Sequence, residues 1–120
     1  MFPMSFDLAV LAMDEDATAE AARRMFYRCN QYGMHDEGEL DDRIVAFYEA
    51  LRADFPDHPP YDDESPWMVM PLDVAIDHVI MFMSFGPRSD PAIRKIQELA
   101  AQHRLVIYDP QSDDVYLPGR

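Results

Sequence analysis

The chain has 120 residues, of which 48% are hydrophobic and 12% aromatic, and its formal net charge is −13. This length predicts one domain spanning residues 1–120, and the composition excludes a disordered chain. A protein with this much negative charge repels the phosphate groups of nucleic acids and of anionic lipids. The charge therefore argues against nucleic acid and anionic membranes as partners. The charge favours a basic protein partner, or serves general solubility alone.

The residues that report on compartment point to the cytoplasm. A single cysteine, Cys29, excludes an intramolecular disulfide and is typical of a reducing environment. No apolar stretch is long enough to span a membrane, and no basic region followed by an apolar core opens the chain as in a signal peptide. The sequence therefore predicts a cytoplasmic protein.

Apolar periodicity and turn residues predict eight elements. In chain order they are strand, helix, helix, strand, strand, helix, strand and a short final strand. The expected strands are 6–13, 67–76, 77–85, 105–109 and 115–118, and the expected helices are 17–33, 40–54 and 89–103. Pro56 ends the second helix, and Pro91 suits the first position of the third.

This order predicts an α+β fold. Without one helix and the last strand it is the split βαββαβ unit of ferredoxin-like domains. We therefore expect a ferredoxin-like βα(α)ββαβ(β) sandwich, with an antiparallel sheet and helices mainly on one face. Right-handed crossovers would place the first and third helices on the same face.

The strand 78–85 is apolar on both faces, which indicates burial on both sides. If the helices cover one face, something else must cover the other. One covering is the acidic, proline-rich segment 55–67, with Phe55, Tyr61 and Trp67 laid on the sheet as a partial lid. The other is a second copy of the chain, which would make a homodimer. The two coverings are compatible.

No set of residues predicts catalysis. The four histidines are scattered, Cys29 lies on the apolar stripe of its helix as inert thiols do, and the acids at 62–64 lack the spacing of a calcium loop. We therefore expect no catalytic residue, no metal and no cofactor.

Acidic residues gather in loops instead, with aromatic residues beside them. Two groups flank the ends of the second helix, and a third lies in the last turn. Carboxylates there can meet lysine and arginine side chains, and aromatic anchors ringed by charge are typical of protein-binding surfaces. The expected partner-binding residues are Asp36, Glu37, Glu39, Asp57, Tyr61, Asp62, Asp63, Glu64, Trp67, Asp113 and Asp114. The plain alternative is that these loops are merely solvated.

Three stretches carry a resemblance: LVIYDPQSDDVYLP, FDLAVLAMDEDAT and AFYEALRADFP. With them the chain looks like small bacterial proteins of unknown role, and it is similar in build to the immunity proteins encoded beside polymorphic toxins. The distinctive segment is Tyr108-Asp109-Pro110-Gln111. The resemblance implies a small, acidic, cytosolic α+β domain; it implies neither an enzyme nor known binding residues.

These observations predict a non-enzymatic protein-binding domain, an immunity protein that neutralises a bacterial toxin by steric and electrostatic blockade. The alternative is a small homodimeric ligand-binding or enzymatic domain with a pocket on the sheet, lined by His78, Met81 and Tyr108. A third interpretation is an acidic structural protein with no dedicated site.

Overall fold

The computed structural model describes residues 6–13, 18–29, 38–56, 66–67, 72–84, 87 and 89–117. In chain order, the elements are β1 (Phe6–Leu11), α1 (Ala19–Cys29), α2 (Asp42–Asp54), β2 (Asp73–Val74), β3 (His78–Met83), α3 (Asp90–Gln102), β4 (Val106–Asp109) and β5 (Asp114–Tyr116). The predicted α+β class and the order of elements are confirmed. Of the expected strand 67–76, the described residues hold β2 and a single bridge at Trp67, and residues 68–71 lie outside the described residues.

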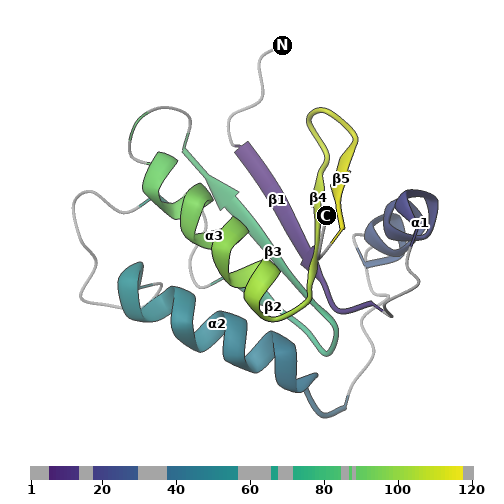
Figure 1. The fold of residues 1–120 in the computed structure, drawn as a ribbon, viewed down its shortest axis with the longest axis horizontal. Coiled ribbons are helices and arrows are strands. Elements are labelled where there is room, and N and C mark those ends of the chain that lie inside the picture. The colour runs from purple at the N-terminus through teal and green to yellow at the C-terminus, as the bar shows by residue number, and fades with distance from the viewer. Residues whose placement is uncertain are drawn as a thin grey trace.

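The five strands form one open sheet in the order β2-β3-β1-β4-β5, and every neighbouring pair is antiparallel. The central strand β1 places Leu8 opposite Met81 of β3 and Ala9 opposite Tyr108 of β4. Figure 1 shows β1 in the middle of the sheet, with the β4–β5 hairpin on one side and β3 on the other.

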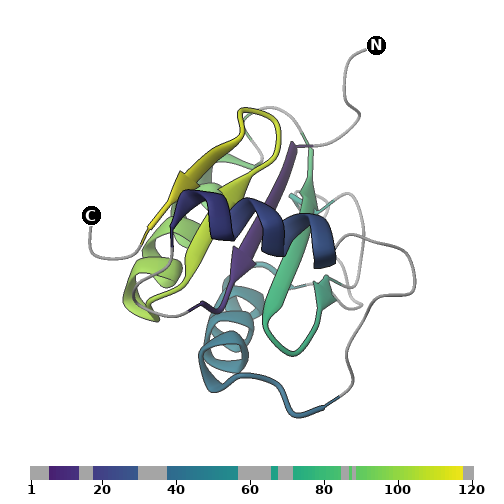
Figure 2. The ribbon, with the colours of Figure 1, turned by 90° about the vertical axis from the view of Figure 1, so that its right-hand side faces the viewer.

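Alternate residues of these strands divide the core into two halves. Leu8, Val10 and Met81 belong to the half that is packed by α2 and α3. Ala9 and Leu11 belong to the other half, which is packed by α1. Figure 2 shows α1 lying across the near face of the sheet while α2 and α3 lie behind it.

The expectation that the first and third helices share a face is therefore wrong: α2 and α3 share it, and α1 lies opposite. The physical reason is connectivity. Two helices follow β1, and it is α2 that precedes β2 and completes the crossover to that strand. The apolar side of α1, formed by Ala22, Met25 and Phe26, is then left for the other face.

The two-sided burial predicted for the strand at 78–85 is confirmed for β3, where only Phe82 is not fully buried. On the second face it is covered by α1, which the sequence did not predict, and a second copy of the chain as a further covering stays a prediction. Phe55 and Trp67, at the described ends of the segment 55–67, pack instead into the half of the core beneath α2 and α3. Residues 57–65 lie outside the described residues.

Phe26 is the largest side chain that α1 buries against the sheet, and its ring centroid lies 4.7 Å from that of Tyr108. We expect Phe26→Ala to lower the free energy of unfolding by about 3–4 kcal/mol, because it leaves a cavity under the helix. Urea denaturation measures this loss. The neighbouring Tyr27 is 62% exposed, so Tyr27→Ala is the control and should cost about 1 kcal/mol. Equal losses in the two variants would contradict the position of α1.

Candidate functional site

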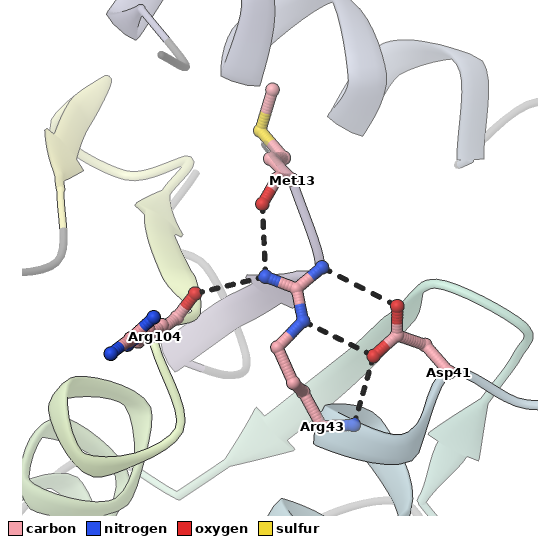
Figure 3. A network of polar contacts seen from close by, with 4 residues as sticks. All are labelled: Met13, Asp41, Arg43 and Arg104. Atoms are coloured by element: carbon pink, nitrogen blue, oxygen red, sulfur yellow. Dashed lines mark hydrogen bonds and ion pairs between the residues drawn. The ribbon is translucent and has the colours of Figure 1, made fainter. Parts of the chain in front are cut away.

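The N-terminal end of α2 is fixed by one arginine, Arg43. Its Nη1 donates to the carbonyl oxygens of Met13, at 2.9 Å, and Arg104, at 3.2 Å. Its Nε and Nη2 donate to the two carboxylate oxygens of Asp41, at 3.2 and 3.3 Å. Figure 3 shows the guanidinium between these three groups. One side chain thus joins the end of β1, the turn after α3 and the start of α2.

Asp41 is the N-cap of α2, since its Oδ1 accepts a hydrogen bond from the backbone amide of Arg43 at 2.8 Å. The side-chain hydrogen bond from Arg43 holds the pKa of Asp41 below its ordinary value of 3.8, against the opposing effect of burial. This carboxylate belongs to the fold and is not available to a partner.

The residues before the cap are held against the turn between β2 and β3. The amide of Asp41 donates to the carbonyl oxygen of Ile76 at 2.7 Å. At Gly38 a Cβ atom would come within 3.3 Å of Ile76 Cδ1, so a larger residue would press on that side chain. Glu39 and Leu40, which lie between Gly38 and Asp41, are exposed.

Two exposed aliphatic side chains lie among these carboxylates. Leu40 is 41% exposed and Val45 is 40% exposed. They occupy the positions before the cap and four residues into the helix, where a hydrophobic staple forms. Asp42 is exposed in the same first turn. We name the surface of Glu39, Leu40, Asp42 and Val45 the α2 patch.

Most of the positive charge on the described residues is already engaged in ion pairs within the chain. Six described basic side chains lie in ion pairs: Arg23 with Asp113, Arg24 with Glu20, Arg28 with Asp77, Arg43 with Asp41, Arg52 with Glu49 and Lys95 with Asp54. Among the described residues, no ion pair engages Glu39 or Asp42. The α2 patch therefore keeps two exposed carboxylates that pair with none of the basic side chains the structure describes.

The structure divides the predicted partner-binding residues other than Trp67 into three groups. Glu39 lies in the α2 patch, whereas Asp113 and Asp114 are exposed at the β4–β5 turn. Figure 1 places that turn at the opposite end of the molecule from α2, so these acids do not form one surface. Seven residues lie outside the described part of the chain: Asp36, Glu37, Asp57, Tyr61, Asp62, Asp63 and Glu64.

Trp67 was expected to anchor a partner, but only 4% of it is exposed. Its Nε1 donates to the carbonyl oxygen of Phe55 at 2.9 Å, the two rings meet edge to face, and its backbone bridges to Met83. Burial inside its own molecule removes Trp67 from the partner surface. The tryptophan instead fixes the chain to the edge of β3.

Asp113 takes part in an internal contact between the last hairpin and α1. The Tyr108 hydroxyl donates to its Oδ1 at 2.6 Å, and Arg23 Nε lies 3.1 Å from the same oxygen. Burial, together with the hydrogen bond to Asp113, raises the pKa of Tyr108 above its ordinary value of 10. Asp113 has a φ of 61°, in the left-handed region that aspartate tolerates in turns. Its carboxylate is therefore partly committed to the fold.

The distinctive segment Tyr108-Asp109-Pro110-Gln111 also has a structural function. Gln111 Oε1 accepts from the amide of Asp7 at 2.7 Å, and its Nε2 donates to the Asp7 carbonyl oxygen at 2.8 Å. Asp109 Oδ1 accepts a hydrogen bond from the backbone N–H of Gln111 at 3.0 Å. The side-chain amide thus continues the β1–β4 ladder where Pro110 has no N–H to offer. Sequence reasoning found the segment but not this purpose.

The pocket expected from His78, Met81 and Tyr108 does not come together. All three are buried, but Met81 lies in the core half beneath α2 and α3 and Tyr108 lies in the half beneath α1. His78 Nδ1 lies 2.9 Å from Asp77 Oδ1, and the Asp77 side chain is 35% exposed and also lies near Arg28. Across the described ranges, no three His, Cys, Asp or Glu side chains gather as they would around a metal ion.

No family model, curated protein or solved structure matches the chain. In the part of the chain that the structure describes, no helix has the length and apolar character needed to cross a membrane. The function must therefore be inferred from the surface itself.

The Asp41–Arg43 contact predicts a pH-dependent contribution to stability. Because the pKa of Asp41 is lowered by folding, that contribution is present above about pH 4 and is lost as the pH falls through the lower, folded value. We expect Asp41→Asn to destabilise the protein by about 1 kcal/mol near neutral pH and by less below about pH 4. Urea unfolding over a pH series measures the difference. A difference for Asp41→Asn that stays the same across the pH series would contradict the assignment.

The ladder completed by Gln111 predicts a second stability effect. Gln111→Ala removes both hydrogen bonds to the Asp7 backbone and should cost about 1 kcal/mol in unfolding free energy. Ser112 is the exposed next residue in the same turn, and Ser112→Ala should change stability by less than about 0.5 kcal/mol. Thermal denaturation of both variants makes the comparison, and a neutral Gln111→Ala would show that the amide does not support the sheet.

Proposed function

We propose that this protein is a non-enzymatic binding domain for a basic protein partner, with the α2 patch at the centre of the contact. The observation that carries the proposal is the distribution of charge. Six basic side chains are paired within the chain, whereas Glu39 and Asp42 remain exposed beside Leu40 and Val45. Such carboxylates gain charge-assisted hydrogen bonds from lysine or arginine side chains of another molecule. The two aliphatic side chains supply apolar contact between them.

The biological role that we propose is that of a cytoplasmic immunity protein. A net charge of −13 would speed encounter with a toxin whose active site is basic, and the bound domain would then cover that site. The support is the overall charge and the sequence resemblance. The hydrogen bonds of residues 108–111 are internal, so that segment supports a likeness of fold rather than a contact with the toxin.

The frame that we propose for this role is ferredoxin-like. Its support is the antiparallel order β4-β1-β3-β2, with α2 and α3 together on one face. In this interpretation, β5 is appended beside β4 and α1 is an addition on the second face. The α2 patch then belongs to the crossover helix between the first two strands of the frame.

The test uses the proteins encoded beside this gene. Each is co-expressed with the protein, and growth and complex formation at low salt are measured. We expect one neighbouring product to be toxic alone, harmless when co-expressed, and bound more weakly as salt rises. The double variant Glu39→Lys/Asp42→Lys should weaken that complex by about tenfold or more, because two attractive charges become repulsive.

The matched control is Asp90→Lys/Glu98→Lys, which makes the same change in net charge. Both residues are exposed on α3, and Asp90 lies in the first turn as Asp42 does in α2. Its effect on the complex should stay within about threefold. Equal losses in the two double variants would assign the effect to overall charge alone. The absence of any complex at low salt would contradict the proposed function.

A further inference from the structure

The two edges of the sheet differ in how far the described chain covers them. Next to β3, Trp67 bridges to Met83 and the amide of Ser84 donates to the carbonyl oxygen of Pro66 at 2.9 Å. The chain thereby covers the part of that edge which the short β2 leaves open. At the other edge, β5 pairs with β4, and among the described residues no backbone group bonds to its outer side.

The direction of the backbone groups along the sheet follows from Asp7. Its N–H and C=O both bond to Gln111, on the side of β4. In an antiparallel sheet these directions alternate along a strand, and hydrogen-bonded partners point toward each other. The backbone N–H and C=O of Ala9, two residues further on, therefore point toward β4. The backbone N–H and C=O of its partner Tyr108 point back toward β1.

The same alternation fixes the outer edge. On β4, Ile107 and Asp109 flank Tyr108, so their backbone N–H and C=O groups point toward β5. There they pair with Tyr116 and Asp114. The remaining residue of β5, Val115, must then turn its N–H and C=O away from β4. The outer edge presents one donor and one acceptor of the backbone, which is the template that an added strand uses.

The side chains of β5 indicate which strand would fit. Tyr116 lies opposite Ile107, on the face of α2 and α3, and is 49% exposed; Asp114 is exposed on the same face. Val115 points to the α1 face. Favourable cross-strand neighbours are a basic residue for Asp114, an aliphatic residue for Val115 and an aromatic or β-branched residue for Tyr116.

We propose that β5 is a docking edge which takes an extended, basic segment of the protein partner as an added strand. This inference rests on the proposed function for the sign of the partner's charge. A second copy of the chain fits less well. Pairing β5 with itself would gather Asp113 and Asp114 of both copies at one edge, between two molecules that each carry a net charge of −13.

The test titrates the full-length protein with a short synthetic peptide, capped at both ends, in which valine alternates with arginine and tyrosine. Amide hydrogen exchange is followed by NMR. When the concentration of free peptide is about ten times the dissociation constant, amide exchange at Val115 should slow by about tenfold. The amides of Asp114 and Tyr116 already bond to β4 and should change little. A peptide with glutamate in place of arginine should not bind.

Two variants of one residue separate the backbone from the side chain. Val115→Pro removes the outward N–H at an edge position that tolerates proline, whereas Val115→Ala removes a similar amount of packing and keeps the N–H. We expect Val115→Ala to bind the peptide within about threefold of the parent and Val115→Pro to bind about tenfold more weakly or not at all. Asp114→Lys keeps every backbone group and should reverse the preference between the arginine and glutamate peptides.

Equal binding by Val115→Pro and Val115→Ala, or peptide binding without slower exchange at Val115, would overturn the docking edge. So would slow exchange at Val115 in the free protein that increases with protein concentration, since the occupant would then be a second copy. These outcomes are distinct from failure of the proposed function. A natural partner that depends on Glu39 and Asp42 but leaves Val115 exchanging freely would refute the edge and keep the function.

Discussion

The structure depends on one constraint: its central sheet is apolar on both faces, and water must be kept from both. Residues of β3 are buried whichever way they point, as Val79 and Ile80 are on opposite sides. The chain meets this constraint with its own helices, two on one face and one on the other. Fully burying a large apolar side chain stabilises by about 2–3 kcal/mol, so α1 is held chiefly by Phe26 and Met25 and only secondarily by its ion pairs.

Once both faces are covered, the surfaces left for recognition are helix exteriors and sheet edges. The α2 patch is held in place by the Arg43 network and by the backbone contact with Ile76. The β5 edge is held in place by the same β1–β4 ladder that Gln111 completes. Both surfaces are positioned by contacts within the chain, and β5 lies along an edge of the sheet, apart from α2 (Figure 1). A partner that used both would have to reach across the sheet.

The sequence predicted what is encoded locally. Periodicity placed the three helices and the central strands, and the alternation in β3 indicated burial on two sides. Local sequence does not encode which element covers the second face of the sheet. The apolar side of α1 resembles that of any amphipathic helix, and the connectivity of the chain decides against which face it packs. Trp67 is a similar case, because its acidic surroundings suggested exposure while its contacts with Phe55 and Met83 bury it. The Arg43 contacts were missed, although an aspartate just before a helix is a signal for a cap.

The position of α1 is the central claim, because an uncovered second face would itself become the binding surface. It is tested most directly by nuclear Overhauser contacts between ring protons of Phe26 and Tyr108 in the full-length protein. The centroids of these rings are 4.7 Å apart, so strong contacts are expected. If Tyr108 instead showed contacts to residues of the segment 57–65 or to a second molecule, and none to Phe26, the covering of the second face by α1 would be contradicted.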